Sequence, residues 1–149
     1  MSFSGYASLF GLADGAGDVV MPGAFRESLR TRGRRGIRML FQHDPSRPLG
    51  VWTDIREDAR GLYVEGELCT GAISVRDIAA LMADGAIDGL SIGFKTVKAA
   101  ESRLTGLRQL LHVDLWEISL VTFPMLGSAR VTHYEHPQPR HGQTFSPRT

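Results

Sequence analysis

Apolar and polar residues alternate along several stretches of the chain, and a period of two is typical of half-buried β-strands. The clearest example is 62–68, where Leu62, Val64 and Leu68 share one face and polar or charged side chains form the other. The run 49–55 precedes it across a polar turn, so the two predict an antiparallel hairpin. Further strands are expected at 3–12, 19–21, 37–43, from about Ser91 to Val97, and 107–123, with an exposed loop at 99–106.

Two segments have helical spacing instead. The first starts at Pro22 and runs to about Arg32, with Gly33 as its C-terminal stop. The second starts at Ser74, in a sequence that resembles a capping box, and ends at Gly85. Its expected apolar stripe consists of Ile78, Leu81 and Met82.

Five arginines stand between residues 30 and 38, close to the end of the first predicted helix. We interpret them as a solvated helix end favoured by the helix dipole. Binding of an acidic protein partner is the alternative interpretation.

Composition narrows the class of protein. The 149 residues are 42% hydrophobic and 22% charged, which is ordinary for one globular domain. No apolar run approaches 18 residues and the polar start lacks the layout of a signal peptide, so we expect neither a membrane partner nor export. The single Cys69 rules out an internal disulfide and fits a reducing cytoplasm. A net charge of +1 argues against nucleic acid as the main partner.

Ser91 is the candidate nucleophile. It lies in the sequence GLSIG, which matches the letters of the G-x-S-x-G nucleophile elbow. An elbow requires a helix after the serine, whereas residues 94–97 alternate as a strand, so we keep the nucleophile and reject the elbow. In a strand Ser91 faces away from its apolar neighbours, and Gly89 and Gly93 leave the hydroxyl uncrowded. A satisfied core serine is the alternative.

Two further polar residues interrupt apolar patterns. His43 ends the apolar face of strand 37–43, and we expect a turn at Asp44–Pro48 to leave its imidazole accessible. Glu117 stands in a segment that is apolar on both faces, where a buried carboxylate needs a partner. That partner is a histidine, or an arginine such as Arg38 or Arg108.

Together these residues predict a catalytic triad. Ser91 is the nucleophile, His43 the general base, and Glu117 the group that orients the histidine. A thiolate at Cys69 acting with His43 is a rival enzyme mechanism, although no cationic neighbour lowers the pKa of that thiol in the sequence. We expect no cofactor and no metal, since His133, His136 and His141 would bind a metal only weakly and no cluster of acidic or cysteine ligands supports a structural site.

Six motifs stand in a fixed order between Gly5 and Val131: GYASLFG at 5–11, DVVMPGAF at 18–25, FQHD at 41–44, PLG at 48–50, GAIDGLSIGF at 85–94 and LWEISLVTFP at 115–124. In this order they resemble the motifs of the tailed-phage prohead maturation protease family, which is related to the herpesvirus assemblins. The resemblance implies a mainly β (α+β) fold, a compact β-barrel with two or more flanking helices.

The resemblance also implies a function. Such a protein is a serine endopeptidase that enters the procapsid in the host cytoplasm and removes scaffold segments, with the major capsid protein and scaffold as substrates. His43 and Ser91 carry over from the family motifs. The third member is Glu117 by its motif, or His112 by analogy with the herpesvirus enzymes, which use a second histidine. The two differ in strand parity, so only one can face Ser91 unless a bulge intervenes.

Further expectations concern the domain boundary, the alternative function, the oxyanion donors and the oligomeric state. Residues 1–131 are expected to form the protease domain and 132–149 a flexible tail, which the protein trims slowly between about Thr132 and Ser146. A catalytically silent assembly factor that binds scaffold is the alternative function. The oxyanion donors are either backbone N–H groups near Gly93 or a loop arginine. A homodimer is a candidate oligomeric state. The sequence is compatible with an origin in a phage, a prophage or a gene transfer particle.

Overall fold

Strands make up most of the chain in the computed structural model, which describes residues 1–135. They join into one eight-stranded mixed sheet, accompanied by three short helices. The strands are β1 (Ser2–Leu9), β2 (Asp18–Val20), β3 (Arg38–Phe41), β4 (Asp44–Glu57), β5 (Gly61–Leu68), β6 (Gly89–Glu101), β7 (Arg108–Val121) and β8 (Val131–Glu135). The helices are α1 (Arg26–Thr31), α2 (Gly33–Gly36) and α3 (Ile73–Ala83).

The sheet follows the order β2-β7-β3-β4-β5-β1-β8, and β6 pairs with the other edge of β7. Strands β2 and β3 run parallel to β7, while the remaining pairs are antiparallel. Near the start of β8 the sheet returns to β6, where an isolated bridge joins Gly89 and Arg130. The sheet is therefore curled and stays open except at this bridge. The predicted mainly β fold with flanking helices is confirmed.

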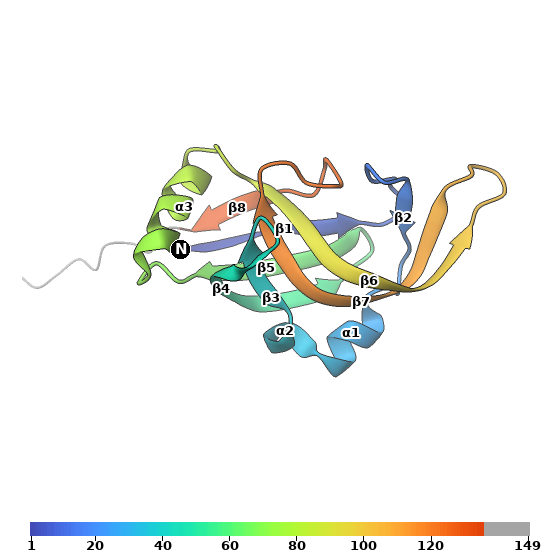
Figure 1. Cartoon of the computed structure of the whole chain (residues 1–149), viewed down its shortest axis with the longest axis horizontal. Helices are drawn as coiled ribbons and strands as arrows, with labels where there is room; N and C mark the ends of the chain where they lie inside the picture. The colour runs from blue at the N-terminus through green and yellow to red at the C-terminus, as the bar shows by residue number, and fades with distance from the viewer. Residues whose placement is uncertain (136–149) are drawn as a thin grey trace, which may run out of the picture.

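The core lies inside the curled sheet, because each strand turns its apolar face inward. Trp52 of β4 is fully buried there and packs edge to face on Phe3 of β1, with ring centroids 5.6 Å apart. Helix α3 contributes Val75, Ile78 and Met82 from one face. In Figure 1, α1 and α2 lie together below the sheet, whereas α3 lies at the end that carries the N-terminus.

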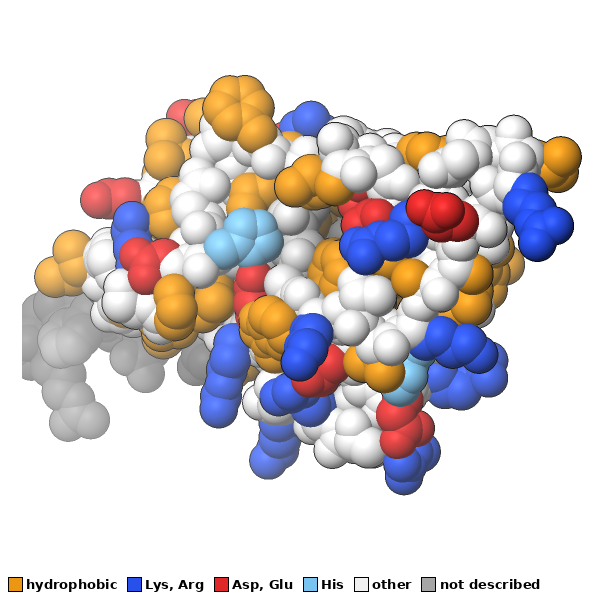
Figure 2. All heavy atoms as spheres, turned by 45° about the vertical axis from the view of Figure 1, so that its right-hand side comes forward, with side chains coloured by type: hydrophobic (Ala, Val, Ile, Leu, Met, Phe, Trp, Pro, Cys, Tyr) orange, Lys and Arg blue, Asp and Glu red, His pale blue; other side chains and the backbone are white. Residues whose placement is uncertain are grey.

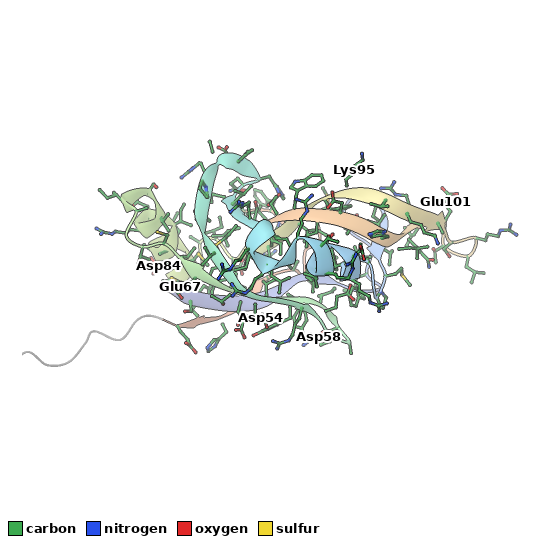
Figure 3. All side chains as sticks on the ribbon, turned by 90° about the horizontal axis from the view of Figure 1, so that it is seen from below. Asp54, Asp58, Glu67, Asp84, Lys95 and Glu101 are labelled. Carbon is green, nitrogen blue, oxygen red and sulfur yellow. The ribbon has the colours of Figure 1, made fainter. Side chains whose placement is uncertain are left out.

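Strands β6 and β7 form the longest hairpin, with 13 and 14 residues. Its far half extends away from the rest of the sheet (Figure 1), and Lys95 and Glu101 lie along it in Figure 3. The pairing continues to Glu101 opposite Arg108, so the loop predicted at 99–106 is shorter than expected. None of the described helices is long and apolar enough to cross a membrane.

Some helix ends differ from the prediction. Helix α1 begins at Arg26 rather than Pro22, after a turn in which the N–H groups of Gly23 and Phe25 donate to the Glu57 carboxylate. Helix α3 begins at Ile73 without any side-chain cap, so the expected capping box is wrong.

The C-terminal boundary also differs. Residues 132–135, which we expected to belong to the tail, are part of β8, which pairs with β1. The remainder of the expected tail, 136–149, lies outside the described residues.

Candidate active site

Three neighbouring strands, β6, β7 and β3, carry the polar residues of the candidate site. In the register of the sheet, Ser91 of β6 stands opposite Ser119 of β7, and Gly93 stands opposite Glu117. On the other edge of β7, Glu117 is opposite Arg38 of β3. Directly paired residues project from the same face of a sheet, so Ser91, Ser119, Glu117 and Arg38 share one face.

His43 lies in the turn that joins β3 to β4. This turn has two central residues, Gln42 and His43, both with positive φ of 54° and 58°, as in a type I′ hairpin. The turn predicted at Asp44–Pro48 is wrong, because β4 already begins at Asp44. Strand alternation ends at Phe41, so His43 does not continue the apolar face of Met39 as expected.

Hydrogen bonds join this turn to the end of β7. The Gln42 N–H donates to the carbonyl of Leu120 over 2.9 Å, and its side-chain amide donates to the Thr122 hydroxyl over 2.7 Å. Left-handed backbone at a residue other than glycine costs of order 1–3 kcal/mol and persists only where surrounding contacts enforce it. These contacts hold His43 over the end of β7.

Glu117 and Ser119 hold the imidazole in place. His43 Nδ1 hydrogen-bonds to Oε1 of Glu117, and the Ser119 hydroxyl donates to Oε2 over 2.7 Å. The backbone N–H of His43 in turn donates to Ser119 Oγ over 3.0 Å. Glu117 is only 3% exposed, and its partner is His43. A histidine was one of the two partners expected for this buried carboxylate. Of the two arginines considered, Arg108 pairs with Asp18 instead.

The electrostatics follow from this contact. The hydrogen bond to Glu117, together with its negative charge, raises the pKa of His43 above the ordinary 6.5, against the opposing effect of partial burial. A carboxylate on Nδ1 favours the tautomer that leaves Nε2 free to accept a proton, and it stabilises the imidazolium formed. A ring held in this way can accept a proton at Nε2, which is the chemistry that a general base requires.

Gly93 makes room for the Glu117 side chain. A Cβ on Gly93 would lie 2.6 Å from Cδ and 2.7 Å from Cγ of Glu117, and closer still to Oε1. Any larger residue would push the carboxylate away from His43. Gly93 therefore leaves space for the Glu117 carboxylate opposite it. The sequence had predicted that this glycine leaves space for the Ser91 hydroxyl.

Ser91 and His43 line the same cavity of about 170 Å³. Ser91 is buried, and the walls around it are mostly apolar side chains: Leu12, Val20, Leu90, Ile92, Phe94, Met125 and Leu126. Within residues 1–135 no hydrogen bond joins Ser91 to His43. Catalytic hydrogen bonds are often long before substrate binds and tighten in the complex.

His112 and Cys69, the alternative catalytic residues, lie away from the cavity of Ser91 and His43. His112 pairs with Lys98 on the extended hairpin, seven residues before Ser119 and thus roughly 23 Å along the strand. Cys69 is exposed and lines neither of the cavities that contain His43. In the described part of the chain, no group of three or more His, Cys, Asp and Glu side chains is placed to hold a metal ion. Of the three histidines considered as metal ligands, His136 and His141 lie outside the described residues.

Sequence reasoning missed Ser119. Its hydroxyl is fully buried and links the His43 backbone to the Glu117 carboxylate. The available signal was its spacing, since it follows Glu117 by two residues and so shares its face of the strand.

The sequence is similar to that of known phage prohead proteases. The sequence model of the family described as caudovirus prohead serine protease matches residues 1–141. The prohead protease of Enterobacteria phage HK97 is 38% identical over 124 residues, which are 82% of this chain and 55% of that protein. The prohead protease of Escherichia phage T5 is 31% identical over 112 residues, 74% of this chain and 52% of that protein. The chain spans about half the length of these curated relatives.

Two solved structures share the fold. The bacteriophage T4 capsid assembly protease matches with a TM-score of 0.62 at 12% identity, over 80% of both chains. KSHV protease, in complex with a hexapeptide phosphonate inhibitor, matches with a TM-score of 0.58 at 9% identity, over 91% of this chain and 65% of that one. The predicted likeness to the herpesvirus proteases is confirmed at the level of fold.

Proposed function

The chain belongs to the caudovirus prohead serine protease family, and from this premise we propose that it is a serine endopeptidase with Ser91, His43 and Glu117 as its triad. The observation that carries the assignment is the His43 ring, which Glu117 holds by Nδ1 at the cavity that Ser91 also lines. Each of the three roles is then filled by a residue of the type that the chemistry requires.

The reaction proceeds as acyl transfer. Ser91 Oγ attacks the carbonyl carbon of the scissile peptide bond while His43 Nε2 takes the hydroxyl proton. The Glu117 carboxylate stabilises the resulting imidazolium, which then gives its proton to the leaving amine as the C–N bond breaks. Water attacks the acyl-enzyme with His43 again as base, and it releases the new carboxyl end and free Ser91.

The substrates are extended segments of capsid and scaffold proteins, cleaved inside the procapsid, and the protein also trims its own C-terminal tail. The outer edge of β6 supports this choice. Among the described strands β6 pairs with β7 alone, apart from the bridge at Gly89. An extended polypeptide can add to such an edge by main-chain hydrogen bonds, which places a peptide bond beside Ser91.

Co-expression with the capsid protein tests the proposal. The wild-type chain should cut the scaffold segment, while Ser91→Ala and His43→Ala should each lose several orders of magnitude in rate and keep their circular dichroism spectra. The double variant should be little worse than either one, because triad members act as a unit. Binding without cleavage by the wild-type chain would instead identify a silent assembly factor.

A further inference from the structure

His43 also lines a second groove. Its volume is about 680 Å³, and Ser91 is not among the residues that line it. The groove is bordered by β3, β6, β7 and the start of β4, and its lining includes Arg38, Leu40, Pro45, Ile92 and Trp116. His43, Ile92 and Phe94 line both this groove and the cavity of Ser91, so the two are adjacent and a side chain of a substrate bound at Ser91 can reach the groove.

The charge of the groove is positive. Arg38 is exposed and makes no ion pair within residues 1–135. The only carboxylate that lines the groove is Glu117, which is buried and already bound by His43 and Ser119. Arg32 also lines it, but Asp114 accepts from its guanidinium over 3.1 Å, so that charge is compensated.

The surroundings extend this character. Trp116 is 41% exposed and offers an aromatic wall next to Arg38. Beyond Arg38 a neighbouring groove is lined by Arg34 and Arg35 together with Val51, and no carboxylate lines it. Figure 2 shows Lys and Arg side chains over the lower part of this face, with a few acidic side chains among them.

We propose that this groove binds an acidic side chain of the substrate, Asp or Glu, and that Arg38 is the residue that selects it. The inference rests on the proposed protease function, and it names a substrate class for that site. Arg38 lies on β3, two strands and thus about 10 Å from the β6 backbone that carries Ser91.

The expected effect is moderate, because ion pairs open to solvent are weak. Such pairs contribute at most about a fivefold change in equilibrium, and salt reduces it. A solvated arginine with no role in binding would give no dependence on substrate charge at this position, which distinguishes the two readings.

Binding to the uncleavable Ser91→Ala chain gives the direct test. The probes are fluorescent synthetic peptides of neutral sequence in which one Glu is placed at each position in turn, with Gln as the matched neutral residue. At one position Glu should bind about fivefold more tightly than Gln at low salt. Adding Arg38→Gln should abolish that preference, and Arg38→Glu should transfer it to a Lys peptide.

Arg103→Gln is the matched control, since Arg103 is exposed on the extended hairpin and its loss changes net charge equally. It should keep the preference for Glu. Equal binding of the Glu and Gln peptides at every position, or a preference that survives Arg38→Gln, would overturn the inference. Because binding is measured without turnover, a failure of the protease assignment would appear separately, as absence of cleavage by the wild-type chain.

Discussion

Gly93→Ala is the substitution that most sharply tests the arrangement of the site. The new Cβ would lie 2.6 Å from Cδ of Glu117 and closer still to Oε1, whereas ordinary contacts begin at 3.4 Å, so the carboxylate must move by at least about 0.8 Å. The side chain of Glu117 is flexible enough to give way, and we therefore expect the fold to survive. The hydrogen bond to His43 Nδ1 is what must be lost.

The catalytic cost follows from that displacement. Misplacing a catalytic group by about 1 Å can cost on the order of 100-fold in rate. We therefore expect kcat/KM for a peptide substrate to fall by about two orders of magnitude, with a change in unfolding free energy of about 1–3 kcal/mol from overpacking. Steady-state kinetics and urea denaturation measure the two quantities separately.

Controls make the result specific to Glu117. Gly71→Ala adds the same methyl group where nothing lies within 4 Å, and it should leave kcat/KM unchanged. In a Glu117→Ala background Gly93→Ala should add little further loss, because both changes remove the same contact. Activity at the wild-type level in the single Gly93→Ala variant would refute the claim that Glu117 acts through His43.

Three other outcomes are expected. Ser119→Ala should lower kcat/KM and destabilise the fold by about 1–3 kcal/mol, because the buried Glu117 carboxylate and the His43 N–H each lose a partner; denaturation and kinetics check both. Glu117→Gln should reduce activity and move the acid limb of the kcat/KM profile to lower pH, because the carboxylate raises the pKa of His43 and a neutral amide does not; an unmoved limb would contradict this. Intact-mass spectrometry over time should show slow loss of residues beyond Glu135 in the wild-type chain, whereas Ser91→Ala stays full length.

The sequence predicts the parts of the site that depend on local chemistry. Glu117 could be found because a carboxylate within an apolar strand must acquire a partner on folding. Ser91 could be found because its flanking glycines interrupt a strand that otherwise favours bulky residues. The hairpin of β4 and β5 was predictable from the alternation in β5 and the polar turn before it, although a register shift between Trp52 and Asp54 breaks the period of two in β4.

The rest depends on tertiary contacts that local patterns do not encode. The Gln42 and His43 turn has positive φ at both residues, although hairpins of this type favour Asn-Gly or Asp-Gly. Its conformation is fixed by contacts with the end of β7, a strand more than seventy residues later. Spacing alone puts Ser119 on the same strand face as Glu117, but its contact with the His43 backbone depends on the turn that brings His43 to the end of β7.

Reaction with a fluorophosphonate tests the central claim most directly, because this reagent captures an activated serine whatever the substrate. Peptide mapping of the wild-type chain should find one adduct, on Ser91. His43→Ala should slow labelling by several orders of magnitude, and an iodoacetamide block of Cys69 should leave it unchanged. Labelling of a different residue, or labelling of Ser91 at the same rate without His43, would contradict the assignment of Ser91 as a nucleophile activated by His43.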